Sequence, residues 1–118
     1  MDGYGLEIDD LPLGILIMDS YDTKKVKGSL TNNGAGFKGK VLLFVHCQKE
    51  LITIDEGSSV LSNDDGKFEF TVESNWYQPN FGSSHDELYA TIECSYSPTG
   101  VDPFTVTNIK VIVKPTPI

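Results

Sequence analysis

The chain has 118 residues, and its formal net charge of −8 comes from 17 acidic residues against 9 basic ones, all of them lysine. A chain of this length fits one domain around a single core, and its longest apolar runs fall far short of the ~18 residues that span a bilayer. Arginine is absent and a polyanion would be repelled by the acidic surface, so we expect no nucleic-acid binding and no membrane insertion.

The N-terminal segment allows two interpretations. We expect residues 1–13 to form an extended N-terminal arm, followed by an apolar stretch at 14–20 that is the first strand. That strand either completes the sheet of its own chain, which is the default, or adds to the sheet of a neighbouring copy. A single domain is expected over 1–118, with the proline-rich residues 115–118 as a terminus or a linker to a following module.

Seven further segments are apolar or alternate between apolar and polar residues, and stretches rich in Gly, Asn, Asp, Ser and Pro separate them. These predicted strands, in chain order, are 25–31, 40–47, 51–55, 59–62, 67–73, 87–96 and 104–114. Short strands at this spacing, with no segment of convincing helical period, predict an all-β fold. The spacing predicts an antiparallel β-sandwich of seven to eight strands in two sheets.

Alternation along the later strands predicts which residues enter the core. The inward residues are expected to be Phe68, Phe70 and Val72 in one strand, and Leu88, Ala90, Ile92 and Cys94 in another. The run 41–45 is apolar on both faces, which is typical of a covered central strand or of one whose outer face meets a partner. In the last strand the spacing between Val106 and Ile109 breaks the alternation, which predicts a bulge at 107–108.

Three motifs in these strands carry a resemblance to a known family. They are Val26-x-Gly28-x-Leu30-Thr31 followed by Gly34, then Gly39-x-Val41-x-Leu43, then Asp65-Gly66-x-Phe68-x-Phe70. Over roughly 25–113 the pattern resembles the immunoglobulin-like β-sandwich modules of bacterial and archaeal surface proteins, including adhesin-like repeats and carboxypeptidase-regulatory-like domains. The resemblance implies a non-enzymatic sandwich and transfers no catalytic residue, because the family motif contains none.

The two cysteines, Cys47 and Cys94, leave their redox state open. With Trp76 between them they invite comparison with antibody domains, but Ile92 stands where a tyrosine corner would place Tyr, which argues against that class. A disulfide between them requires Cα atoms about 4.4 to 6.8 Å apart, and it would favour an oxidising, extracellular setting. The alternative is two free, buried thiols.

Neither a metal site nor a catalytic site is predicted. Asp64-Asp65-Gly66 offers oxygen ligands for Ca²⁺, but Asp-Gly is also a common hairpin turn, and we favour the turn. His46 and Cys47 are adjacent in a strand and point to opposite faces, and His85 is isolated, so no zinc ligand set is present. We therefore expect no metal, no cofactor and no enzymatic activity.

The best binding-site hypothesis falls on the segment 75–85. It combines Trp76, Tyr77 and Phe81 with amides such as Asn80, and aromatic rings beside polar groups suit protein interfaces and sugar rings. The alternative is that these rings fold back to close one end of the sandwich.

Three functional classes follow. The first is a non-enzymatic structural or adhesive module of a cell-surface protein that mediates spacing or protein recognition, located outside the cell or at its surface. The second is a virion component, such as a capsid decoration or tail module, and the third is a carbohydrate-binding accessory. The expected partners are therefore a protein or a glycan on a surface, or neighbouring copies or modules.

Overall fold

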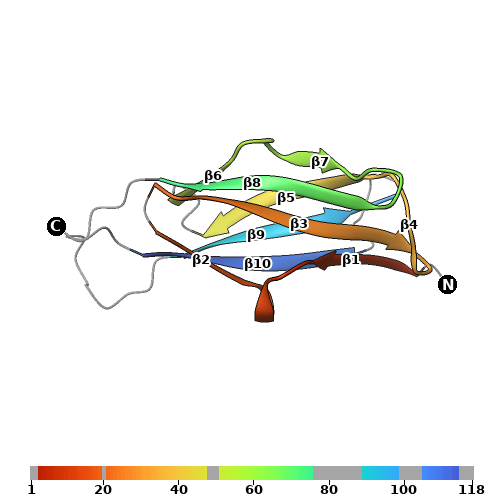
Figure 1. Cartoon of the computed structure of the whole chain (residues 1–118), viewed down its shortest axis with the longest axis horizontal. Coiled ribbons are helices and arrows are strands. Elements are labelled where there is room, and N and C mark those ends of the chain that lie inside the picture. The colour runs from red at the N-terminus through yellow and green to blue at the C-terminus, as the bar shows by residue number, and fades with distance from the viewer. Residues whose placement is uncertain (1–2, 20, 48–50, 76–88, 99–104, 115–118) are drawn as a thin grey trace.

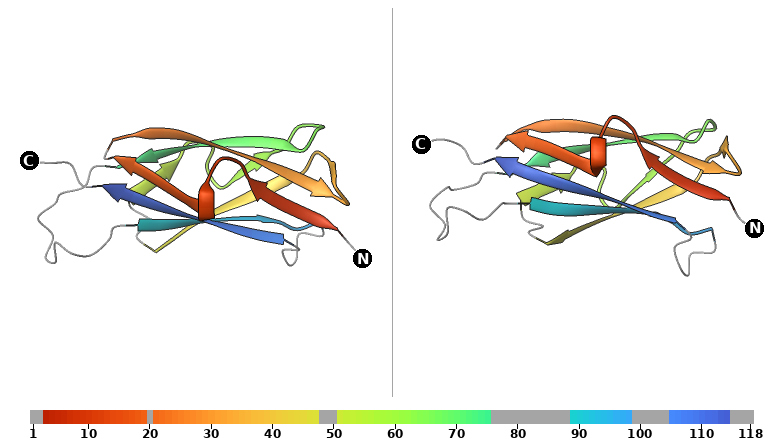
Figure 2. Two further views of the ribbon diagram at one scale, coloured as in Figure 1. Left: turned by 60° about the horizontal axis from the view of Figure 1, so that its bottom comes forward. Right: turned by 90° about the horizontal axis from the view of Figure 1, so that it is seen from below.

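In the computed structural model the chain forms two β-sheets packed face to face, and residues 3–19, 21–47, 51–75, 89–98 and 105–114 are described (Figure 1). Sheet A contains β1 (Tyr4–Ile8), β3 (Thr23–Asn32), β8 (Lys67–Ser74) and β6 (Ile52–Ile54) in that order, with the short β4 (Ala35–Gly36) beside β3. Sheet B contains β2 (Ile15–Asp19), β10 (Thr105–Lys114), β9 (Tyr89–Tyr96), β5 (Lys40–Cys47) and β7 (Ser59–Leu61) in that order. Figure 2 shows the two layers, with β3 and β8 in one and β9 and β10 in the other.

This architecture confirms the prediction of an all-β, immunoglobulin-like sandwich. The order β1-β3-β8-β6 against β10-β9-β5 is the strand arrangement of that fold. All eight predicted strands are present, with ends shifted by a few residues, but the described part of the chain also contains β1 and β4. The expected number of seven to eight was therefore too low. Within the described residues the only helix is the three-residue 3₁₀ turn η1 (Pro12–Gly14).

The N-terminal segment is not an extended arm, which corrects the expectation for residues 1–13. Its β1 strand pairs antiparallel with β3 and buries Leu6. The chain then crosses at η1 to the other layer, where β2 pairs with β10 in parallel. The sandwich is consequently not purely antiparallel, and β2 completes a sheet of its own chain.

The core lies between the two sheets and follows the predicted alternation. Phe70 and Val72 of β8 are fully buried, as are Ala90, Ile92 and Cys94 of β9. Leu88 lies outside the described residues. Because each inward residue is followed by an outward one, the two layers share a single apolar cluster and leave two outer faces.

The predicted bulge at 107–108 is wrong. The register between β10 and β9 runs without a break from Thr105 to Ile112. Thr107 takes the inward position instead, and its hydroxyl donates a 2.7 Å hydrogen bond to the carbonyl of Leu6, while Val106 points outward. A hydroxyl with a hydrogen-bond partner can lie inside the sandwich. The in–out alternation therefore continues, with the polar Thr107 inside and the apolar Val106 outside.

Gly28 is required by the packing of β3 on its neighbours. A Cβ atom at this position would lie 2.9 Å from Cε1 of Phe68 and 2.6 Å from the carbonyl oxygen of Glu7. The second contact is to backbone, which cannot move aside as a flexible side chain would. The glycine of the motif Val26-x-Gly28-x-Leu30 therefore makes room for the Phe68 ring in the core.

We predict that Gly28→Ala lowers the free energy of unfolding by about 1 to 3 kcal/mol, the usual cost of overpacking. Urea denaturation measures the effect. The neighbouring Ser29→Ala, on the outward side of the same strand, serves as the control and should change stability by about 0.5 kcal/mol or less. Equal stability of the two variants would contradict the steric role of Gly28.

Candidate functional site

The first and last strands place the two ends of the described chain at opposite ends of the molecule. The molecule measures 51 × 24 × 22 Å, with its long axis along the strands. The chain enters β1 at Tyr4 at one end and leaves β10 at Lys114 at the other (Figure 1). Between them β2 and β10 pair in parallel, with Ile15 opposite Lys110 and Asp19 opposite Lys114. The N-terminal segment and the last strand are thus directly hydrogen-bonded.

Ser74, at the end of β8, fastens the far end of β2 to sheet A. Its side chain is buried, its hydroxyl donates to the carbonyl of Asp19, and it accepts a 2.7 Å hydrogen bond from the amide of Asp22. The Ser74 amide also donates to the carbonyl of Asp22 at 2.9 Å. These hydrogen bonds connect the turn between β2 and β3 to sheet A. Strand β2 is therefore bonded along its length to β10 and at its C-terminal end to Ser74.

The outer face of sheet A is charged. On the outward side of this sheet Lys27 of β3 lies opposite Glu69 of β8, and Lys67 donates a 2.9 Å hydrogen bond to the Ser29 hydroxyl. A side-chain hydrogen bond with Asp55 and the charge of that residue raise the pKa of Glu73. Interspersed charges of both signs are typical of a solvated face.

The outer face of sheet B is apolar by comparison. Six large hydrophobic residues are exposed among those described, and four of them lie on this face: Ile17, Phe44, Leu61 and Val106. They come from four different strands, and partly exposed Leu42 and Ile112 lie between them on the outward side. The double apolar run of β5 thus arises because Val41 and Leu43 enter the core while Leu42 and Phe44 face outward. We call this surface the sheet B outer face.

Polar groups on the sheet B outer face are arranged in pairs. His46 Nε2 lies 3.7 Å from a carboxylate oxygen of Glu93 on the neighbouring strand. The ammonium group of Lys110 lies 4.7 Å from the centre of the Tyr89 ring, within range of a cation–π interaction. An apolar surface with a few paired polar groups resembles the composition of protein interfaces.

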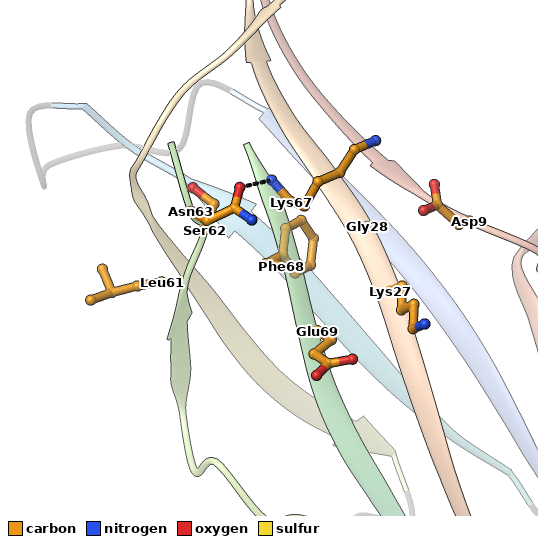
Figure 3. A pocket seen from close by; sticks show the side chains of 9 residues that line it. All are labelled: Asp9, Lys27, Gly28, Leu61, Ser62, Asn63, Lys67, Phe68 and Glu69. Carbon is orange, nitrogen blue, oxygen red and sulfur yellow. Dashed lines mark hydrogen bonds between the residues drawn. The ribbon is translucent and has the colours of Figure 1, made fainter. Parts of the chain in front are cut away.

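A groove of about 550 Å³ lies at the side of the sandwich between β7 and β8 (Figure 3). It is lined by Asp9, Lys27, Gly28, Leu61, Ser62, Asn63, Lys67, Phe68 and Glu69. Lys27 and Lys67 accompany Asp9 and Glu69, so the groove has no single charge sign, and the side chain of Asn63 accepts a 3.0 Å hydrogen bond from the Lys67 amide. Within the described residues no three His, Cys, Asp or Glu side chains are grouped to hold a metal ion.

Three aromatic rings meet where β4 and the start of β1 lie. The ring centres of Tyr4, Phe37 and Tyr96 are separated by 5.3 to 5.9 Å in tilted or edge-on arrangements. Burial and the neighbouring Tyr4 raise the pKa of Tyr96. Phe37 and Tyr96 also pack on the core, so this cluster closes one end of the sandwich.

The predicted binding residues Trp76, Tyr77, Asn80 and Phe81 lie outside the described residues. The prediction for this segment therefore stays untested.

The structure contains no disulfide between Cys47 and Cys94, and Cys94 is a free, buried thiol. Both cysteines lie in sheet B, where Cys94 is opposite Leu43 and Cys47 is opposite Ala90. Four register positions separate them, which is about 13 Å along a strand and far beyond the reach of an S–S bond. In antibody domains the bridged cysteines lie in different sheets, which is the arrangement this chain lacks.

Comparisons with known proteins bear on the fold. No protein-family model and no curated protein matches the sequence. Among solved structures, domains 4 and 5 of the S-layer protein SbsC superpose with a TM-score of 0.62 at 15% identity, covering 96% of this chain and 46% of that chain. The periplasmic chaperone SfaE gives a TM-score of 0.62 at 7% identity, covering 96% of this chain and 59% of that chain.

The YadV chaperone gives a TM-score of 0.60 at 13% identity, covering 93% of this chain and 51% of that chain. The chain thus spans about half the length of the structures that it resembles. Identities this low show a shared sandwich fold and nothing more specific. Among the described residues no helix is long and apolar enough to cross a membrane.

Sequence reasoning missed the residues that connect the sheets. Ser74 and Thr107 bond to the backbone of partners far away in the sequence, Asp19 and Leu6, so no local pattern marks them. The sheet B outer face did leave a signal, because the run 41–45 is apolar at every position. That run indicated a partner or a cover for one strand, but not that three further strands contribute to the same surface.

We predict that Cys94 does not react with thiol reagents in the native protein. Burial raises the pKa of its thiol from 9.0 to about 12, so the reactive thiolate is scarce at pH 8. In a Cys47→Ser background, where Cys94 is the sole thiol, a chromogenic disulfide reagent should label the protein only after denaturant is added. Rapid labelling without denaturant would show that Cys94 is accessible.

Proposed function

We propose that this chain is a non-enzymatic structural module of a cell-surface protein, which spaces the segments joined to its two ends and transmits load between them. The parallel pairing of β2 with β10 is the observation that carries the proposal. Tension applied where β1 begins and where β10 ends would act along the strands, because these strand ends lie at opposite ends of the long axis (Figure 1).

The direction of pulling determines how the hydrogen bonds between β2 and β10 are loaded. Parallel strands pulled in opposite directions share the force over the evenly spaced bonds of the whole ladder. A hairpin opened from its end would instead lose its bonds one at a time. The bonds of Ser74 to Asp19 and Asp22 add resistance where β2 ends. This geometry suits a module that must stay folded under tension.

The fold and the charge support a surface setting. A similar sandwich occurs in the S-layer protein SbsC, and the family that the sequence resembles contains surface modules. A net charge of −8 favours solubility and limits non-specific self-association. Spacing requires no bound cofactor and no reacting group, in agreement with the absence of a catalytic motif from the sequence.

We expect a polyprotein of repeated copies, stretched from both ends by atomic force microscopy, to unfold in single steps with distinct force peaks. Each step should release roughly 300 to 400 Å of chain, the extended length of a module of this size less its folded length. Absence of a force peak at the release of each module would contradict the load-bearing role.

A matched pair of core variants tests whether the β2–β10 pair provides the resistance to mechanical unfolding. Met18→Ala in β2 and Ile52→Ala in β6 both remove a large buried side chain, and each should lower the free energy of unfolding by about 2 to 5 kcal/mol. The unfolding force should fall for Met18→Ala and change little for Ile52→Ala, because only the former loosens the β2–β10 pair. Equal reductions of force would assign the resistance to the whole core.

The sheet B outer face favours protein recognition as a second function. Its exposed Phe44, flanked by Leu42 and the His46–Glu93 pair, offers an aromatic anchor of the kind that dominates binding energies. The charged outer face of sheet A has no such anchor. An adhesive module could therefore present sheet B to its partner and sheet A to solvent.

Binding to immobilised collagen, fibronectin and laminin tests this second function by biolayer interferometry. If one of these proteins binds through sheet B, Phe44→Ser should weaken the affinity about tenfold or more, the effect of losing a hot spot. Lys25→Ser on sheet A is the control and should leave affinity unchanged. Equal affinities of the two variants would exclude the sheet B outer face as the binding surface.

A further inference from the structure

The open edge of sheet B is formed by β2. Among the described residues β10 is the only strand paired with it, so its other side has no strand beside it. Its four residues before Asp19 are Ile, Leu, Ile and Met, without a charge or a proline. Edge strands in soluble proteins usually carry a device that prevents pairing with another chain, and β2 carries none within these four residues.

The backbone of β2 has hydrogen-bonding groups that point away from β10. The Asp19 amide approaches the Asp22 carboxylate at 3.5 Å and its carbonyl accepts from Ser74, both away from β10. The amide and carbonyl of one strand residue point to the same side, and the side alternates along the strand. The groups of Ile17 and Ile15 therefore face the open edge, whereas those of Leu16 and Met18 face β10.

In sheet A, the stretch 67–71 of β8, which β6 does not pair with, shows the contrast. Beyond its pairing with β6, the amide of Thr71 donates a 2.7 Å hydrogen bond to the Glu56 carboxylate, and the amide of Lys67 donates to the Asn63 side chain at 3.0 Å. Side chains thus occupy positions that an added strand would need, and charged residues flank them. Of the edge strands besides β2, β1 contains Glu7, and β6 and β7 have three residues each.

Exposed apolar side chains frame the open edge. Leu13 is 95% exposed and Tyr21 is 70% exposed, and each adopts a positive φ just before or just after β2. Ile17, in the middle of the strand, is 52% exposed. A bulky residue at positive φ is uncommon. Here this backbone conformation at Leu13 and Tyr21 places both apolar side chains in solvent beside β2.

We propose that β2 pairs with β2 of a second copy of this chain in an antiparallel, two-fold arrangement. Placing Ile15 opposite Ile17 of the second copy satisfies the four outward backbone groups of Ile15 and Ile17 in each strand; those of Asp19 have partners within their own chain. The same placement brings Leu13 near Tyr21 of the second copy at both ends of the interface. The two B sheets then continue into one another through a pair of strands that are identical and self-complementary.

The charges along this edge favour a second copy. Two chains of charge −8 repel each other over most of their surfaces. Along β2, however, Asp19 lies opposite Lys114 and Ile15 lies opposite Lys110, so the edge carries no excess of negative charge. In the proposed register Asp19 of one copy lies within about a Debye length of Lys110 of the other, which adds attraction.

The interface is smaller than a typical stable one. Five residues of strand with two flanking side chains bury less than the ~800 Å² per partner of standard interfaces, so a weak and reversible dimer is expected. This pairing is independent of the load-bearing role, because β2 uses its opposite side to bind β10.

Amide hydrogen exchange by NMR at protein concentrations from roughly 10 μM to about 1 mM tests the proposal. Exchange of the Ile15 and Ile17 amides should slow about tenfold or more as concentration rises, while the Leu16 and Met18 amides stay protected throughout. Sedimentation velocity should show the matching shift from monomer to dimer. A monomer at all concentrations, with unchanged exchange at Ile15 and Ile17, would overturn the proposal.

Two lysine variants distinguish the edge from the outer face. Ile17→Lys places a charge on the open edge and should abolish the concentration dependence, whereas Phe44→Lys on the same sheet, away from the edge, should leave it intact. Both residues are about half exposed, and circular dichroism checks that both variants fold. Loss of dimer with Phe44→Lys but not with Ile17→Lys would place the contact on the sheet B outer face and refute edge pairing.

Discussion

The parallel hydrogen bonding between β2 and β10 is the constraint on which the rest of the molecule depends. It joins the two extremes of the sequence, Ile15 with Lys110 and Asp19 with Lys114. Inside the sandwich it sets Leu16 and Met18 beside Val111 and Val113, all buried. Because the crossing at η1 lets β1 complete sheet A before β2 completes sheet B, one short segment closes both layers of the core.

The two outer faces show how one alternating pattern can serve two surfaces. In β8 the positions that alternate with the buried residues are Lys67, Glu69, Thr71 and Glu73, so the outer face of sheet A is solvated. In β5 the outward positions include Leu42 and Phe44, and β10 of the same sheet adds Val106 and Ile112. The core would be satisfied by the inward residues alone. The apolar residues on the sheet B outer face lie outside the buried core cluster, which is why we propose recognition for that face.

Much of the fold could be predicted because turns and alternation are local. The Asp65-Gly66 turn and the alternation of Phe68, Phe70 and Val72 place β8 without any tertiary information. β1 was missed because its sequence, Tyr-Gly-Leu-Glu-Ile, has a single buried residue, Leu6, and only its pairing with β3 makes it a strand. The bulge was wrong because Thr107 satisfies its hydroxyl on Leu6, a contact across the sandwich.

The functional surfaces and the state of the cysteines were less predictable, because they too depend on contacts between segments far apart in the sequence. Whether Cys47 can reach Cys94 depends on the register of β5 against β9, and a shift of the pairing would change the answer without altering either strand's pattern. The parallel pairing of β2 and the role of Ser74 likewise depend on which distant segments become neighbours. The sequence does show an uncharged apolar segment before Asp19, but only the sheet order shows that one side of it is bonded and the other is open.

Edge protection differs between the two sheets, and the difference has a physical consequence. Glu56 and Asn63 close the edge of β8 with side-chain hydrogen bonds that water could have supplied equally well, so their gain in stability is small. Their clearer effect is to exclude another strand. A chain that blocks this stretch of β8 and leaves the outward groups of Ile15 and Ile17 unblocked favours strand addition at β2. Two-fold pairing at that one edge ends at a dimer, whereas two open edges would permit an unlimited sheet.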